Sequence, residues 1–308
     1  MIVTVTLNAA IDKRYEVEKL ETGEVNRVKS SRYGAGGKGL NVSRVAVTAK
    51  EAVTATGFAG GYTGQLLEEL AQKDGIETAF VHTQGETRTC INIKDLKTGE
   101  QTELLEGGET VLPEKAAEME EKYRELLTGA YVVTISGSVP KGVDGKLYIR
   151  MIQMAKEAGI PVLVDTSGTL LLQCIEAAPD LIKPNQDEIK QITKKADLSK
   201  DELRETAVKI RDKGISYVVV SLGKDGSVMA SPSGVYEARV PLIQAVNTVG
   251  CGDSMLAGLA IGIKNHWTDE EILRYASAIS AANALQEATG FFVKSDFEEL
   301  YKKITILK

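Results

Sequence analysis

Residues 248–253 combine residue types that can catalyse group transfer. Their sequence, Thr-Val-Gly-Cys-Gly-Asp, precedes an apolar stretch rich in small residues, which predicts a buried helix. The amides of Gly250, Cys251 and Gly252 at the positive end of that helix form an anion hole for a transferring phosphoryl group. Asp253 beside them could take the proton from an attacking hydroxyl. Because Asp is also favoured structurally in a first helical turn, the segment alone leaves both roles open.

Two further segments suit a nucleotide and a metal ion. Residues 221–226 (Ser-Leu-Gly-Lys-Asp-Gly) end an expected core strand, and their glycines leave room for a nucleotide at the carboxyl edge of a sheet. Asn185 and Glu188 lie at an expected helix start, where both side chains can face the same way and hold a hydrated Mg²⁺. Each segment also has a structural explanation: a hairpin turn for the first, and an N-cap with its capping partner for the second.

The glycine-rich residues 34–39 (Gly-Ala-Gly-Gly-Lys-Gly) precede an expected helix over residues 40–50. They contain the pattern G-x-G-x-x-G. A dinucleotide fingerprint, however, follows the first core strand and is followed by an acid about 20 residues later. Here the first strand ends near Leu7, and Ala59 occupies the position of the acid, so the nicotinamide interpretation fails.

The same glycines do not form a P-loop either. Arg32 stands where the first glycine of that motif is required, and Gly39 stands where Ser or Thr is required. Two interpretations remain. The segment is either a tight turn into a helix or backbone that approaches a polar ligand closely, with Lys38 and Asn41 as donors.

Composition limits the class of function. The chain has 308 residues, 43% of them apolar, enough for a large core in one elaborated domain or in two domains. Acidic and basic residues mix along the chain, with a net charge of -6 and a pI near 5.3, and no basic block attracts nucleic acid. Because no apolar run could span a bilayer and no cationic leader is present, we expect a cytoplasmic protein without a membrane partner that acts on a small substrate.

Cysteines and histidines offer little chemistry. The three cysteines, Cys90, Cys174 and Cys251, are far apart, so we expect reduced thiols rather than disulfides or a zinc site. His82 and His266 have no partner in the sequence and are expected at packing or surface positions. Carboxylates and backbone amides must then carry any chemistry.

The elements that position these residues follow an α/β pattern. Short β-branched runs at residues 53–58, 131–136, 161–165 and 217–222 alternate with amphipathic stretches, which predicts a parallel sheet with helices on both faces. Capping boxes mark three helix starts: Ser199 with Glu202, Thr268 with Glu271, and Ser295 with Glu298.

Two segments depart from this alternation. Each contains two expected strands joined by a turn, near Gly23 in the first and near Gly99 in the second, with no helix between them. Such strand pairs predict a small sheet that projects from the main domain, and a lid is its natural function. We expect a single domain over residues 1–308, with a lid formed by about residues 13–34 and 87–107.

As a set, seven ordered motifs resemble the PfkB branch of the ribokinase-like carbohydrate kinases over essentially the whole chain. They are residues 7–12 (LNAAID), 36–42 (GGKGLNV), 87–88 (TR), 135–140 (ISGSVP), 183–185 (KPN), 221–223 (SLG) and 249–254 (VGCGDS). The resemblance implies an α/β fold, a three-layer α/β/α ribokinase-like domain with a mostly parallel central sheet and a small β-sheet lid. It also implies ATP and Mg²⁺, a sugar or sugar-phosphate substrate, and a homodimer joined through the lids.

The resemblance also assigns roles to single positions. Asp253 would deprotonate the acceptor hydroxyl beside the amides of residues 250–252. The implied substrate-binding residues are Asp12, Gly37 and Asn41 for sugar hydroxyls, Lys38, Arg27 and Arg88 for a phosphate already on the sugar, and Ser138. The implied ATP-binding residues are Lys183, Asn185, Ser221, Gly223, Gly226 and Asn283, with Glu188 and Asn185 positioning magnesium through water. Because Arg27 and Arg88 fall on the two lid segments and guanidinium forks match phosphate geometry, a sugar phosphate is favoured over a free sugar.

Two positions depart from the family pattern. Ala9 stands where relatives usually have Pro, which affects a turn more than the chemistry. Cys251 replaces a commoner Ala or Ser, a change that keeps the amide donor and adds a thiol near the site. Neither change alters the implied reaction.

Within the family, residues 25–28, 85–91, 101–106 and 283–287 look more like those of tagatose-6-phosphate kinases than of fructose-1-phosphate kinases. We therefore expect conversion of tagatose 6-phosphate to tagatose 1,6-bisphosphate. Conversion of fructose 1-phosphate to fructose 1,6-bisphosphate is the alternative, because discrimination between the two sugars depends on only a few contacts with the protein. A non-catalytic sugar-phosphate sensor and a nicotinamide-dependent oxidoreductase are the less favoured classes.

Overall fold

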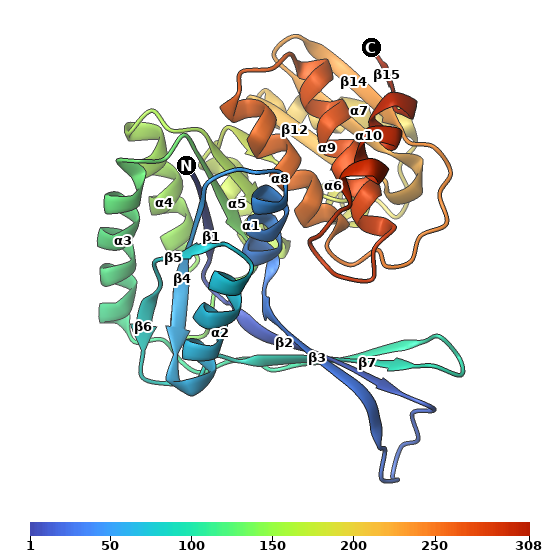
Figure 1. The fold of residues 1–308 in the computed structure, drawn as a ribbon. Coiled ribbons are helices and arrows are strands. Elements are labelled where there is room, and N and C mark those ends of the chain that lie inside the picture. The colour runs from blue at the N-terminus through green and yellow to red at the C-terminus, as the bar shows by residue number, and fades with distance from the viewer.

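Strand β1 (Ile2–Thr6) lies inside the main sheet of the protein. All five of its residues are buried, as in strands that are covered on both faces. In the computed structural model, which describes residues 1–308, β1 pairs in parallel with β4 (Val53–Gly60) and β9 (Val132–Ser136) (Figure 1). The other strands of this sheet are β5 (Glu77–Thr78), β6 (Val81–Thr83), β10 (Val162–Asp165), β11 (Leu181–Ile182), β12 (Tyr217–Ser221), β13 (Ser227–Ser231), β14 (Gly234–Arg239) and β15 (Thr305–Leu307).

The eleven-stranded sheet is mostly parallel, as predicted. Its order is β15-β14-β13-β12-β11-β10-β9-β1-β4-β5, and β6 pairs separately with β4. Strands β13 to β15 are antiparallel and extend one edge. The four strands expected from β-branched runs are β4, β9, β10 and β12, so that part of the prediction is confirmed. The carboxyl ends of the parallel strands all meet at one edge of the sheet.

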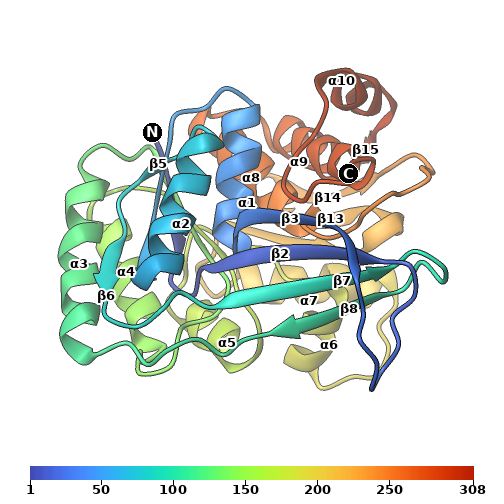
Figure 2. The ribbon, with the colours of Figure 1, turned by 60° about the horizontal axis from the view of Figure 1, so that its bottom comes forward.

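A separate sheet of four strands projects from the main body, at the bottom of Figure 1. Its order is β3-β2-β7-β8, with β2 and β7 parallel at its centre (Figure 2). The predicted strand pairs and their turns are present, but β2 begins earlier and β3 ends later than expected, so the sheet reaches the main domain. The bounds are β2 (Ala10–Val17), β3 (Val28–Gly36), β7 (Thr89–Asp95) and β8 (Gln101–Leu105).

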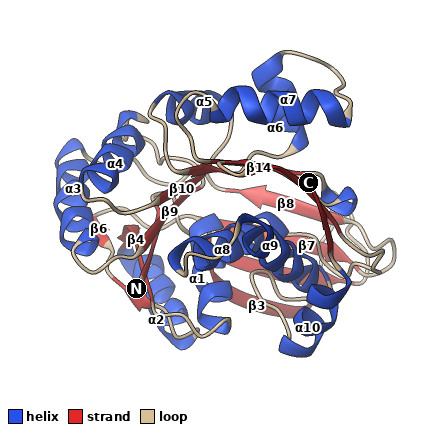
Figure 3. Cartoon of the chain, turned by 90° about the horizontal axis from the view of Figure 1, so that it is seen from above, coloured by secondary structure: helices blue, strands red, loops and turns tan.

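Helices cover both faces of the main sheet and complete three layers (Figure 3). Because side chains alternate along a strand, Ile2 belongs to one hydrophobic core and Val3 to the other. The first core lies under α1 (Lys38–Thr48), α2 (Gly61–Lys73), α8 (Cys251–Lys264), α9 (Asp269–Ala284) and α10 (Lys294–Lys303). The second lies under α3 (Pro113–Leu127), α4 (Lys146–Glu157), α5 (Gly168–Glu176), α6 (Gln186–Thr193) and α7 (Lys200–Arg211). None of the helices is both long and apolar enough to cross a membrane.

Helix α8 is anchored by its close contact with α9. A Cβ atom at Gly258 would lie 2.6 Å from the Cα atom of Ala276, so only glycine permits this approach. Ten consecutive residues of α8, from Asp253 to Gly262, are buried. The helix is therefore buried from Asp253 onward and fixed by packing along its length, whereas Cys251 and Gly252 at its start are only half-buried, so the predicted burial of the start holds only from Asp253.

Two of the three predicted capping boxes are confirmed, and the third is wrong. Ser199 and Thr268 each cap a helix, α7 and α9, with the expected glutamate bonding back to the cap. Helix α10 instead begins at Lys294, after Val293, with no side-chain cap. Ser295 is thus the second helical residue, two positions after the capping residue, which is too late to bind the free amides. Helix α1 also begins two residues before the expected start, at Lys38.

Candidate active site

A cleft of about 1250 Å³ lies where the small sheet faces the carboxyl ends of the main sheet's strands. Side chains from both sheets and from the starts of α1, α6 and α8 line it. The predicted site residues that line it are Asp12, Gly37, Lys38, Asn41, Arg88, Lys183, Asn185, Glu188, Ser221, Gly223, Gly226, Gly250, Cys251, Gly252 and Asp253. Fifteen positions spread over the whole sequence therefore meet in one cleft.

The start of α8 lines the cleft. Gly250 caps the helix with a φ of 79°, and a Cβ atom there would lie 2.6 Å from the Thr289 side chain, so glycine is required. Cys251 and Gly252 follow in the first turn, where backbone amides and the helix dipole favour an anion. The Cys251 amide makes a long bond of 3.3 Å to the Thr248 carbonyl.

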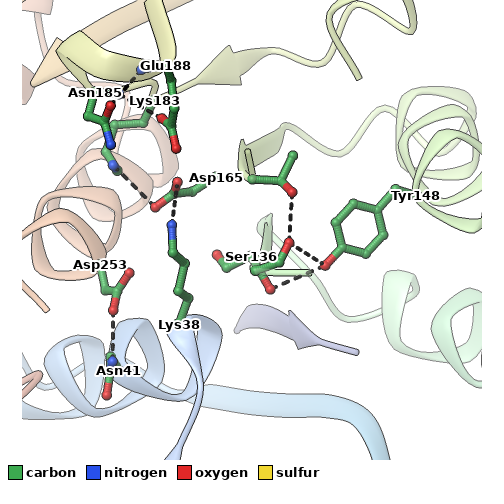
Figure 4. A network of polar contacts seen from close by, with 11 residues as sticks. Lys38, Asn41, Ser136, Tyr148, Asp165, Lys183, Asn185, Glu188 and Asp253 are labelled. Atoms are coloured by element: carbon green, nitrogen blue, oxygen red, sulfur yellow. Dashed lines mark hydrogen bonds and ion pairs between the residues drawn. The ribbon is translucent and has the colours of Figure 1, made fainter. Parts of the chain in front are cut away.

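Asp253 is a buried carboxyl group with one direct hydrogen-bond donor. The Asn41 Nδ2 atom donates to its Oδ2 atom at 2.8 Å (Figure 4). Burial, reinforced by the negative charge of Asp165, raises the pKa of Asp253 to about 6, against the opposing effects of Asn41 and the nearby lysines. A carboxylate with this pKa is ionised at neutral pH and is a better base than an exposed Asp.

Asp165 holds two lysines at the floor of the cleft. It ends β10, is 2% exposed, and lies 3.2 Å from the Nζ atoms of both Lys38 and Lys183 (Figure 4). Burial alone would raise the pKa of Asp165, but the two ammonium groups outweigh burial and lower it. This cluster of three therefore carries two cations and one buried anion, and the Asp253 carboxylate lies close enough to interact with all three groups.

Asn185 and Glu188 form a complete capping box at the start of α6. The Asn185 Oδ1 atom accepts from the Glu188 amide, and Glu188 Oε2 accepts from the Asn185 amide, both at 2.8 Å. The structural explanation is therefore correct, yet both residues also line the cleft. Glu188 keeps a second carboxylate oxygen. No group of three His, Cys, Asp or Glu side chains could hold a metal ion, so protein ligands alone make no metal site.

Residues 221–226 form both a hairpin and a wall of the cleft. The Leu222 amide donates to the Gly226 carbonyl at 2.9 Å, which closes the turn between β12 and β13 around the short helix η1 (Gly223–Asp225). Val240, Ile243 and Phe291 add apolar surface to the same cleft. A planar, partly apolar group fits between these walls.

The small sheet contributes Asp12 from β2 and Arg88 from just before β7. Burial raises the pKa of Asp12 to about 6, although Arg44 and Arg88 oppose the shift. The Arg88 guanidinium donates to the Asn8 carbonyl at 2.9 and 3.2 Å and to the Glu106 carbonyl at 3.2 Å. These bonds fix a cation at the rim of the cleft.

Three predicted residues do not line the cleft. Arg27 is exposed in the loop between β2 and β3, and Ser138 accepts a hydrogen bond from the Asn8 side chain. Asn283 is fully buried: it donates to the Val249 carbonyl and accepts from the amides of Gly290 and Phe291. Asn283 therefore links the loop before α8 to residues 290 and 291 after α9.

Two residues that line the cleft, Asp165 and Arg44, were not among the predicted site residues. Asp165 is the last residue of an expected strand, and ligand-binding residues of parallel sheets gather at that position, so a signal existed. Arg44 lines the cleft from α1 and contacts Asn41. Its spacing of three residues from Asn41 places both on one helix face, which is a weaker signal.

Comparisons with known proteins agree with this geometry. Residues 3–296 match the model of the pfkB family carbohydrate kinases. A tagatose-6-phosphate kinase of Staphylococcus epidermidis is 38% identical over 311 residues, covering 100% of both chains. Among solved structures, phosphofructokinase-2 from Escherichia coli in complex with substrates and products has a TM-score of 0.92 at 28% identity over 98% of both chains. Ribokinase from Arabidopsis thaliana complexed with ribose and ATP has a TM-score of 0.77 at 21% identity over 98% of both chains, which shows a common fold.

The family match covers nearly the entire chain, and one relative aligns with it from end to end. The three-layer fold with its small extra sheet is accordingly ribokinase-like, as predicted. The chain therefore belongs to the pfkB family of carbohydrate kinases and is an ATP-dependent sugar kinase.

Proposed function

We propose that this kinase phosphorylates tagatose 6-phosphate to tagatose 1,6-bisphosphate. The observation that carries the proposal is the buried Asp253 carboxylate, which shares one cleft with the cationic groups of Lys38 and Arg88. A base and cations around one cleft suit an acceptor that has both a hydroxyl and a phosphate. The choice of sugar is supported by the 38% identity with a tagatose-6-phosphate kinase over the full length.

In this proposal Asp253 takes the proton of the attacking hydroxyl. The positive end of α8 and the ammonium group of Lys183 stabilise the charge on the transferred phosphoryl group. Asp12, with Gly37 and Asn41, holds the sugar hydroxyls, and Lys38 and Arg88 hold the phosphate already present. Catalysis then rests on positioning and charge stabilisation.

We propose that ATP lies against the wall formed by Ser221, Gly223 and Gly226, with Lys183 and Asn185 near its phosphates. The free oxygen of Glu188 faces the same cleft, so Glu188 and Asn185 suit a magnesium ion held through water. Bound Mg²⁺ would supply charge neutralisation to the ATP phosphates. The lack of a three-ligand protein site agrees with an ion held mainly by phosphate and water.

We also propose that the small sheet, about residues 13–34 and 87–107, is a lid and that two copies of the chain dimerise through it. Tyr15, Ile93 and Leu104 alternate along their strands with Arg14, Asn92 and Glu103, which line the cleft, and none of the three lines it. These three side chains lie on the opposite face of the sheet, where a second lid can bind.

The test is an ADP-release assay with tagatose 6-phosphate, fructose 1-phosphate and fructose 6-phosphate. We expect the highest kcat/KM with tagatose 6-phosphate and a loss of about 100-fold or more in Asp253→Asn. Preference for fructose 1-phosphate would identify a 1-phosphofructokinase instead. Calorimetric binding of these sugars without turnover of any of them would identify a sensor, and full activity of Asp253→Asn would refute the assigned base.

A further inference from the structure

Arg44 lies one turn after Asn41 on α1 and connects four parts of the structure. Because it is three residues from Asn41, both side chains lie on the same helix face. Its guanidinium donates to Asp74 Oδ2 at 2.7 Å, the Ala35 carbonyl at 2.7 Å, the Thr289 carbonyl at 3.2 Å and Asn41 Oδ1 at 3.1 Å. These partners fix the guanidinium in one position beside the cleft.

The contact with Arg44 determines which way the Asn41 amide points. A guanidinium only donates hydrogen bonds, so the amide oxygen of Asn41 must face Arg44. The NH₂ group then faces the other way and donates to Asp253 Oδ2 at 2.8 Å. If the amide were turned over, its oxygen would meet the Asp253 carboxylate and its NH₂ group would meet the guanidinium, and both contacts would be repulsive.

We propose that Arg44 is a positioning residue for phosphoryl transfer, which holds the Asn41 amide so that its NH₂ group donates to Asp253. This inference rests on the proposed role of Asp253 as the base. With Oδ2 occupied by Asn41, Oδ1 is the oxygen left to accept the proton of the sugar hydroxyl. The hydrogen bond from Asn41 also favours the ionised form of Asp253, because an N–H group bonds more strongly to a carboxylate than to a protonated carboxyl group.

Other groups around Asp253 also affect its charge, and they stay unchanged in the test. Helix α9 faces the start of α8 with the uncharged side chains of Ser280 and Asn283. The titratable groups near Asp253 are Lys38 of α1, Asp165 of β10, Lys183 after β11 and Cys251 of α8.

The test compares the pH dependence of kcat/KM in the wild type, Arg44→Met, Asn41→Leu and the double variant. We expect Arg44→Met to move the acid limb upward by about one pH unit, since a bond that favours the charged base is lost. The double variant should show the same limb as Asn41→Leu alone, because Arg44 acts through Asn41. Arg44→Lys keeps the positive charge but lacks the planar guanidinium with its several donors, so its acid limb should move in the same direction by a smaller amount.

Asp74→Asn is the matched control. It removes the charge that pairs with Arg44 but keeps an acceptor oxygen, so Arg44 stays bound to Asn41 and the acid limb should not move. Circular dichroism and thermal unfolding check that each variant folds. If Arg44→Met does not fold, the pH dependence of Arg44→Lys is compared with that of the wild type instead.

Two outcomes overturn the inference. An unshifted acid limb in a folded Arg44 variant, with only a lower unfolding temperature, would reduce Arg44 to a structural clamp. A shift of the same size in the Asn41→Leu background would assign the effect to the charge of Arg44 itself. Full activity of Asp253→Asn is a separate result. It would show that Asp253 is not the base, and the inference about Arg44, which depends on that role, would fall with it.

Discussion

Asp165 and Asp253 are both buried acids near the floor of one cleft, but their surroundings act on them in opposite directions. Two ammonium groups lower the pKa of Asp165, whereas burial raises the pKa of Asp253 to about 6. Acids whose surroundings separate their pKa values commonly have different roles in one site. Here Asp165 keeps its charge to hold Lys38 and Lys183, and Asp253 is suited to exchange a proton.

We expect Asp253→Asn to raise the free energy of unfolding by about 3 kcal/mol at about pH 8. Above about pH 6 the wild-type carboxylate is charged in both the folded and the unfolded state, and only the folded state bears the cost of burying it. As the pH falls through about 6 the folded carboxyl takes up a proton, and near its ordinary pKa of 3.8 the difference disappears. Urea unfolding at several pH values measures this.

The control for that prediction is Asp197→Asn, because the Asp197 side chain is 98% exposed and its ion pair with Lys190 is worth little. Its unfolding free energy should stay within about 0.5 kcal/mol of the wild type at every pH. A less stable Asp253→Asn at about pH 8 would mean that Asp253 stabilises the fold, contrary to its burial.

Residue patterns predicted most of the polar residues and glycines that meet in the cleft, because these residues occur in short, ordered motifs. Asp165 and Arg44 were missed for a physical reason. An acid at a strand end and an arginine in a helix are ordinary in sequence, and their roles depend on contacts with residues far along the chain. The separation of Asn283 from the cleft depends in the same way on the packing of α9 against α8.

At the scale of elements, Thr268 caps the start of helix α9, whereas Ser295, which looked like a cap in the sequence, does not cap α10. Thr268→Ala should lower the free energy of unfolding by about 1 kcal/mol, since the Glu271 amide loses its acceptor and the Glu271 carboxylate loses the hydroxyl at 2.7 Å. The matched variant Ser295→Ala should change it by less than about 0.5 kcal/mol, because Ser295 is exposed inside the helix. Chemical denaturation of both variants gives the comparison, and equal losses would restore Ser295 as a cap.

Runs of β-branched residues predicted four strands of the main sheet, but its shortest strands could not be predicted. Strand β11 has only two residues, Leu181 and Ile182, which is too short for a periodic pattern. The antiparallel edge of β13 to β15 joins segments about seventy residues apart, a pairing set by tertiary packing. The small sheet was predictable because its two hairpins interrupt the α/β alternation.

At the scale of the whole molecule, the small sheet proposed as a lid has two faces of different character. The face toward the cleft has polar side chains such as Arg14, Asn92 and Glu103, and the opposite face has Tyr15, Ile93 and Leu104. A lid exposed on its own would leave this second face in water. Two lids packed through it would bury both apolar surfaces at once, as in symmetric dimers.

Leu104→Glu tests that arrangement, because Leu104 is 54% exposed in the single chain and would be buried between two lids. We expect the wild type to sediment as a dimer and the variant as a monomer, since burying an unpaired carboxylate costs several kcal/mol. Leu172→Glu is the matched control: Leu172 is 46% exposed but lies on α5, in the main domain, so the variant should stay dimeric. A monomeric wild type, or a Leu104→Glu variant that remains dimeric, would show that the apolar face of the lid is not the interface.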